Sequence, residues 1–200
     1  MTTTTKTKTT TKKAATKPKS TTETLDLPVN PFAFEVFNLV SKQRSNAKKV
    51  EVLKKYEDPS IKSVLIWNFD ESIISLLPEG DVPYSSTKDQ TSYSGTLSGK
   101  IDDAVYKMGE LNSQSLGAAD QGKSTIRKEY TRFYNFVKGG NDSLSSLRRE
   151  TMFINILEGL HPLEAEIVCL VKDKQLETKY KITKEIVAEA YPDIQWGGRS

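Results

Sequence analysis

Pairs of a capping residue and a proline constrain this chain most, because each pair fixes where a helix begins. Asn30-Pro31 and Asp58-Pro59 each place a side-chain oxygen at a helix N-cap and a proline at the first helical position. Apolar residues follow both pairs at the spacing of three and four that marks one face of a helix. They are Ala33, Val36, Phe37 and Val40 after the first pair, and Ile61, Val64, Leu65 and Phe69 after the second. The sequence therefore predicts two helices, one from Pro31 and one from Pro59.

The same spacing recurs along most of the chain and predicts the remaining helices. They are a helix capped by Ser45 or Asn46, one from Ile101 to Leu111, one capped by Ser124 with Ile126, Tyr130, Phe133, Tyr134 and Val137 inward, one capped by Asp142 or Ser143 with Leu144, Leu147, Phe153, Ile154, Leu157 and Leu160 inward, one over 163–171, and one capped by Thr183. No segment alternates with period two over a useful length, and no Asn-Gly or Asp-Gly hairpin signal is present. The predicted fold class is all-α, a compact bundle of about seven or eight short helices.

The first 24 residues differ from the rest in composition. They contain twelve threonines, six lysines and one acid, for a net charge of +5. Such a segment cannot bury enough apolar surface to fold, so we expect a disordered tail. Residues 25–200 are predicted to form a single helical domain, with a mobile loop near 80–99 and a Gly/Ser-rich linker near 112–122.

The net charge of the chain limits the classes of partner that it is expected to bind. The whole chain carries 29 bases and 26 acids, so removing the tail leaves 23 bases and 25 acids, a net of −2 for the domain. This sum argues against a basic nucleic-acid-binding domain. The tail is either a solvated extension or an electrostatic tether to nucleic acid or an acidic partner. The tether would use Lys6, Lys8, Lys12, Lys13, Lys17 and Lys19. No apolar run approaches 18 residues, so we expect no membrane span and no membrane partner.

One octet matches an enzyme motif. Residues 117–124 read G-x-x-x-x-G-K-S, the pattern in which backbone N–H groups wrap phosphates, Lys123 reaches the outer phosphates and Ser124 binds magnesium. A P-loop follows a buried parallel strand, whereas the segment before this octet is too polar and too short to form one. We therefore favour a Gly/Ser linker whose Ser124 caps a helix, with nucleotide binding as the less favoured alternative.

The sequence predicts structural roles for the other residues that could carry chemistry. His161 precedes Pro162 and favours a cap or turn, and Cys169 lies among aliphatic residues and favours burial. A single histidine and a single cysteine leave too few ligands for a zinc site, and we expect no catalytic residue, cofactor or metal. The run 148–150 is interpreted as a solvated face. The aromatics at 130–136 are interleaved with Arg127, Lys128 and Arg132 and could stack on single strands, but at helical spacing they favour the core.

The C-terminus ends in a tryptophan among glycines and one arginine, at residues 196–200. Two interpretations stay open: Trp196 folds back onto the domain, or it is a peptide ligand for a partner together with Arg199.

Several stretches are similar to a known family. They are LLPEGDVPY at 76–84, RRETMFI at 148–154, LEGLHP at 157–162, VKDKQL at 171–176 and ITKEIVAEAYP at 182–192. Over residues 30–195 the chain resembles a family of small, largely uncharacterised proteins from tailed phages of the T4-like group, including phages of marine cyanobacteria. The tail and the stretch before Ser124 depart from the resemblance.

The resemblance implies a non-enzymatic protein that acts by contact with other phage proteins during head assembly, as an inhibitor of the head-maturation protease. Its place would be the host cytoplasm during infection, or the virion. Proteases of this kind are expected to cut after Leu/Ile-x-Glu sites, and both 77–79 and 156–158 fit that pattern. The first lies beside the predicted loop. The candidate partner contacts are Leu77, Pro78, Glu79, Tyr84, Trp196 and Arg199.

Overall fold

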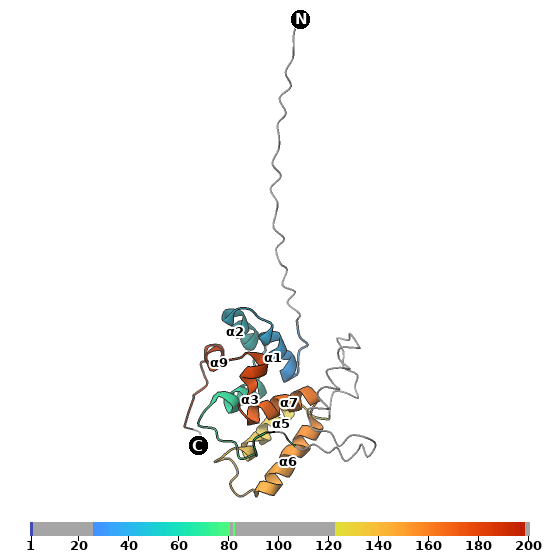
Figure 1. The fold of residues 1–200 in the computed structure, drawn as a ribbon, viewed down its shortest axis with the longest axis vertical. Helices are drawn as coiled ribbons and strands as arrows, with labels where there is room; N and C mark the ends of the chain where they lie inside the picture. Colours follow the sequence, from blue (N-terminus) through green and yellow to red (C-terminus); the bar gives the residue numbers. More distant parts are fainter. Residues whose placement is uncertain (2–25, 81, 83–122, 199–200) are drawn as a thin grey trace.

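A computed structural model describes Met1 and residues 26–80, 82 and 123–198, drawn in colour in Figure 1. The predictions for the tail and its six lysines, for the helix at 101–111 and for the Gly/Ser-rich linker lie outside these residues. So does the predicted loop beyond Gly80, apart from Val82, and so do Tyr84 and Arg199.

The described residues form an all-α fold of eight α-helices and one 3₁₀ helix, and they contain no strand. The helices are α1 (Ala33–Ser41), α2 (Asn46–Lys55), α3 (Pro59–Phe69), α5 (Ile126–Glu129), the 3₁₀ helix η1 (Tyr130–Phe136), α6 (Ser146–Gly159), α7 (Pro162–Lys172), α8 (Leu176–Tyr180) and α9 (Lys184–Ala190). One isolated antiparallel bridge joins Ser75 to Val137.

Helix α7 lies at the centre and packs against α1, α3, α6 and α8 (Figure 1). Its Ile167, Val168 and Val171 are fully buried, as the aliphatic run predicts. Helices α2 and α9 pack against each other at one end, and α5, η1 and α6 lie toward the other (Figure 1). This arrangement leaves α2 at the edge, in contact mainly with α1 and α9.

The local cap predictions are correct at α2 and α3. Ser45 Oγ accepts a hydrogen bond from Lys48 N at 3.3 Å, and Asp58 Oδ1 accepts one from Ser60 N at 2.8 Å. The prediction that Asn30 caps the first helix is wrong. Helix α1 begins two residues later than predicted, after Phe32, and Asn30 Oδ1 instead accepts a hydrogen bond from Arg127 Nη1 at 2.8 Å.

The segment 126–136 is helical as predicted but changes type. One turn of α-helix, α5, leads into the 3₁₀ helix η1, which has three residues per turn. That period aligns positions 130, 133 and 136, so Phe133 and Phe136 point into the core. Tyr134, predicted to point inward, is 53% exposed.

The start of α6 is later than predicted because a buried arginine fixes the turn before it. The N-cap is Ser145, not Asp142 or Ser143, and Leu147 is 75% exposed. Arg149, interpreted from the sequence as part of a solvated face, is 6% exposed. Its Nε donates to the carbonyl of Asn135 at 2.8 Å. Its Nη2 donates to the carbonyls of residues 141 and 144, both at 3.0 Å. The turn 141–144 is thereby held out of the helix.

Candidate functional site

An apolar pocket lies between α3 and η1, and we call it the Trp67 pocket. Its volume is about 440 Å³. The residues lining it are Pro59, Lys62, Ser63, Ile66, Trp67, Ile73, Tyr130, Thr131, Phe133, Tyr134 and Val137. A pocket of this size and lining suits an apolar side chain of a partner or a small apolar ligand.

A cluster of aromatic rings makes the floor of the pocket rigid. The Trp67 ring centroid lies 5.4 Å from that of Phe133 and 6.2 Å from that of Phe136, with the second pair stacked. Phe136 meets Phe153 of α6 edge to face at 5.2 Å. Centroid distances of this order are those at which aromatic pairs attract. The pocket wall is therefore part of the hydrophobic core.

The bridge between Ser75 and Val137 fixes the side of the pocket that is lined by Ile73 and Val137. Leu76 N donates to the carbonyl of Phe136 at 2.8 Å, and Lys138 N donates to the carbonyl of Ile74 at 2.9 Å. This places the segment 73–76 alongside the end of η1. Ile73 of this segment and Val137 both line the pocket.

The pocket also contains a polar group without a partner. Trp67 is 3% exposed, and its Nε1–H makes no hydrogen bond to any described residue. A buried donor left unpaired costs about 1–3 kcal/mol, so most are paired. The exposed Tyr134, which lines the pocket, favours a partner that brings an apolar side chain.

The sequence predictions do not include this pocket. In the sequence, Ile66 and Trp67 widen the apolar stripe of the helix predicted from Pro59. That width was the available signal: α3 buries Ile61, Val64 and Leu65 on its core face, whereas Ile66 stays half-buried at the pocket. A stripe wider than the core face of a helix indicates a second surface to be covered.

A second hollow of about 300 Å³ lies where the N-termini of α1, α3 and α5 converge, and its polar groups pair with one another. Glu164, 1% exposed, accepts hydrogen bonds from Ala33 N at 3.1 Å and from Ile126 N at 2.8 Å. Arg127 Nε lies 3.0 Å from Asp58 Oδ2. Burial raises the pKa of Glu164, against the lowering effect of the two N–H donors and of Arg127. These groups hold three helix ends together, which is a structural role.

The described end of the P-loop-like octet is committed to other contacts. Lys123 N and Ser124 N both donate to the carbonyl of Gly159 at 2.8 Å, and Ser124 Oγ donates to Glu129 Oε1 at 2.7 Å. In a P-loop these groups would face phosphate and magnesium. The octet leads into the four-residue helix α5, with Thr125 rather than Ser124 at its N-cap. Residues 117–122 lie outside the described residues.

His161 has the predicted capping role. Its Nδ1 accepts a hydrogen bond from Leu163 N at 3.1 Å, and its ring stacks on Phe34 with centroids 4.9 Å apart. Cys169, expected to be buried, is only partly so. Within residues 26–80 and 123–198, no three or more His, Cys, Asp or Glu side chains gather as they would around a metal ion. No described helix is long and apolar enough to cross a membrane.

The candidate partner contacts at 77–79 divide between core and surface. Leu77 is 7% exposed and belongs to the core, so its side chain is not free for a partner, whereas Pro78 and Glu79 are exposed. Lys172 Nζ donates to the carbonyl of Pro78 at 2.7 Å and to that of Gly80 at 3.2 Å. The turn at 78–80 is therefore held by the Lys172 ammonium group. Ile156 and Leu157 of the other Leu/Ile-x-Glu site are also buried.

The C-terminal segment folds back onto the domain. Gly197 N donates to Asp70 Oδ2 at 3.0 Å, and Lys184 Nζ lies 5.4 Å from the ring centroid of Trp196. Trp196 is half-buried against the core. The sequence left two interpretations open, and the structure agrees with the one in which Trp196 folds back onto the domain.

A comparison with protein-family models matches residues 36–108 and 110–178 of the chain to one family, described as a family of unknown function (DUF6433). The chain belongs to this family. The match includes α2, α3, η1 and α7, and it starts after the lysine-rich first 24 residues. No curated protein and no solved structure matches the chain.

Proposed function

We propose that this DUF6433 protein is a non-enzymatic phage protein that acts through protein–protein contacts in head assembly, and that it inhibits the head-maturation protease. The resemblance to proteins of T4-like phages supports the phage setting and the protease as target. The observation that supports action by contact is the Trp67 pocket, an apolar hollow with an aromatic floor and the exposed Tyr134 in its lining.

The pocket has the composition of an interface centre. Tyrosine and tryptophan are enriched at the centres of protein interfaces, where they supply large apolar area together with one polar atom. Tyr134, 53% exposed, supplies both here, and the buried Trp67 lines the pocket beside it. Their position on α3 and η1, which pack on the core, means that the surface exists before any partner binds.

A cleavage assay tests the proposal. The purified head-maturation protease would cut a peptide with a Leu-x-Glu site in the presence of increasing amounts of this protein. We expect inhibition by the wild-type chain. Tyr134→Ala should weaken it about tenfold or more, equivalent to ~1.4 kcal/mol or more of binding free energy. No inhibition by the wild-type chain would refute the protease as target.

A matched control separates the pocket from general loss of apolar surface. Leu147 is an exposed large apolar residue on α6 and does not line the pocket. Leu147→Ala should inhibit like the wild type. Equal weakening by Leu147→Ala and Tyr134→Ala would show that the pocket is not the contact surface. Glu79→Gln, which changes only an exposed side chain, tests the turn at 77–79 without disturbing the core.

Nucleotide binding is the less favoured alternative, since Ser124 and the Lys123 amide are already bonded within the domain. Lys123→Ala changes only this function, so ATP or GTP binding lost in that variant would support it.

A further inference from the structure

Positive charge is concentrated on one helix of the described structure. The stretch 42–55, which is α2 with the turn before it, contains six bases and one acid, a net charge of +5. Residues 25–200 contain 23 bases and 25 acids, so subtracting this stretch leaves 17 bases and 24 acids, a net of −7. The net charge of −2 for residues 25–200 is therefore the sum of a strongly positive stretch and a strongly negative remainder.

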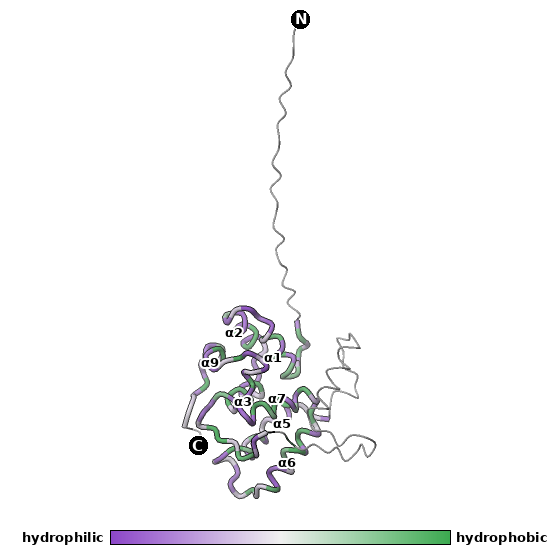
Figure 2. Tube along the Cα trace, viewed as in Figure 1, coloured by the Kyte–Doolittle hydropathy of each residue, from purple (hydrophilic) through white to green (hydrophobic). Residues whose placement is uncertain are grey.

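Most of these bases are exposed to solvent and make no ion pair with a described residue. Helix α2 buries only Val50 and Leu53, and Figure 2 shows hydrophilic residues along its outer turns. Two of the six bases are engaged: Lys49 Nζ donates to the carbonyl of Lys181 at 2.6 Å, and Lys55 pairs with Asp26. The other four are exposed and make no ion pair with a described residue. They are Lys42, Arg44, Lys48 and Lys54.

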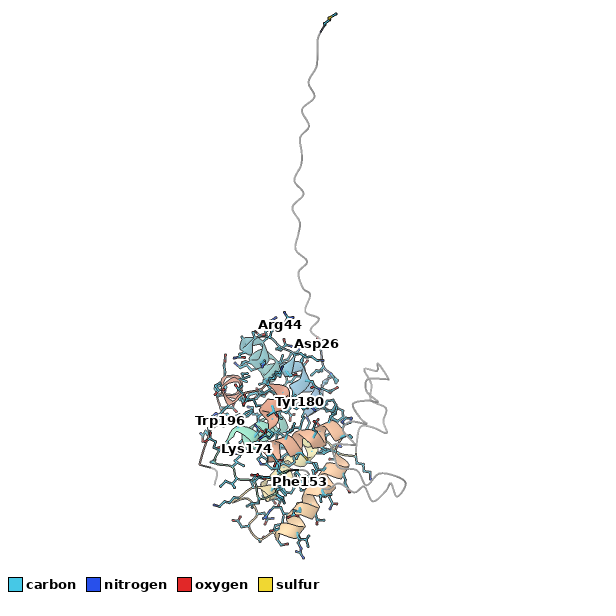
Figure 3. The ribbon with its side chains drawn as sticks, viewed as in Figure 1. Asp26, Arg44, Phe153, Lys174, Tyr180 and Trp196 are labelled. Carbon is cyan, nitrogen blue, oxygen red and sulfur yellow. The ribbon has the colours of Figure 1, made fainter. Side chains whose placement is uncertain are left out.

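The ion pair of Lys55 with Asp26 also places the start of the described domain beside α2. Figure 3 shows Asp26 and Arg44 at the same end of the molecule. The six bases of 42–55 repel each other, and a polyanion bound there would reduce that repulsion.

The chemistry of this surface fits a phosphate backbone better than a protein. Lysine is depleted at protein–protein interfaces, which depend on apolar and aromatic centres. No large exposed apolar residue lies within 42–55, and Tyr56 at the end of α2 is half-buried with its hydroxyl bonded to Leu27 N at 3.0 Å. Binding of single strands depends on exposed aromatic rings for stacking, so a double strand is the better fit.

We propose that α2 and the turn before it bind the phosphate backbone of duplex DNA without sequence specificity, through Lys42, Arg44, Lys48 and Lys54. Helix α2 has ten residues and is about 15 Å long, so several duplex phosphates lie within reach of its side chains. The surface lies on a different helix from the Trp67 pocket, and the proposal does not depend on the proposed function.

Fluorescence anisotropy with a labelled mixed-sequence DNA duplex tests this, using the full chain between about 50 and 200 mM salt. The variant K42Q/R44Q/K48Q/K54Q neutralises the surface. The control K128Q/R132Q/K138Q/R148Q removes the same charge from exposed residues of α5, η1 and α6 and the turn between them. A third variant replaces the six lysines of residues 1–24 by glutamine.

The α2 variant should bind about tenfold or more weakly than the control at low salt. Its plot of log K against log salt should be flatter by up to about 3.6, because each phosphate contact contributes about 0.9. Equal binding by the α2 variant and the control would overturn the proposal. Loss of all binding in the tail variant alone would assign the contact to the tail instead. Tighter binding to polyglutamate than to the duplex would assign the surface to an acidic protein, and tighter binding to a single strand would refute the duplex.

Discussion

Glu164 provides the sharpest test of how this fold is held together. Its two carboxylate oxygens accept hydrogen bonds from Ala33 N and Ile126 N, the first residues of α1 and α5. Glu164→Gln keeps one acceptor but turns the other oxygen into an NH₂ donor that faces an N–H. One buried donor then loses its acceptor, which costs about 1–3 kcal/mol. Glu164→Ala removes both acceptors, and the expected loss is about 2–6 kcal/mol, less the cost of burying the charge.

Urea unfolding followed by circular dichroism measures both losses. Glu166→Gln is the matched control, because it makes the same change two residues along α7, where the side chain pairs at the surface with Lys179. A surface pair of this kind contributes about 0–1 kcal/mol. If Glu164→Gln and Glu166→Gln lowered the free energy of unfolding equally, the reasoning about the helix junction would be refuted.

The pH dependence supplies a second, independent check. Burial raises the folded-state pKa of Glu164 above its ordinary value of 4.5, against the lowering effect of Arg127 and the two N–H donors, and Glu35 adds to the rise. The folded chain then binds more protons than the unfolded chain between those two pKa values. The contribution of Glu164 to stability is therefore largest below about pH 4.5 and falls as the pH rises through the folded pKa. The difference between wild type and Glu164→Gln should shrink across that window.

Three other contacts give shorter tests. Arg149→Met removes the donors to three carbonyls, so we expect a loss of about 2–5 kcal/mol in urea unfolding and faster amide exchange over 139–145, whereas Arg148→Met should change neither. Lys172→Met should release the turn at 78–80 and speed amide exchange there, and an unchanged exchange rate would contradict the role given to its ammonium group. Asp70→Ala should free the C-terminal segment, which limited proteolysis after residue 190 would detect as faster cleavage.

The sequence predicted those features that depend on neighbours along the chain. Caps such as Ser45 and Asp58 bond to an amide two or three residues away, and the apolar spacing of α1, α2, α3 and α7 is local as well. His161 is a further case, since its bond to Leu163 N spans two residues. The all-α fold could be predicted because it follows from the sum of such local choices.

The failures involve contacts that no local pattern in the sequence indicates. Glu164 lies 131 residues from Ala33, and no pattern in the sequence indicates that one carboxylate serves two helix ends. Arg149 looked like part of a charged run because its carbonyl partners lie at the end of η1 and in the turn 141–144, whose path could not be predicted. Helix α8 was missed for another reason: five residues with only Leu176 and Tyr180 buried are too short to show a period.

The candidate surfaces show the same limit in a different form. A net charge adds over residues without regard to where the fold places them, so the net charge of −2 for residues 25–200 argued against the kind of nucleic-acid surface that we propose on α2. The Trp67 pocket was hidden for the opposite reason, since its residues looked like ordinary core. The two surfaces lie on separate elements, α2 and the pair of α3 and η1, and share no residue. A loss of DNA binding without a loss of protease inhibition, or the reverse, would therefore assign each activity to its own surface.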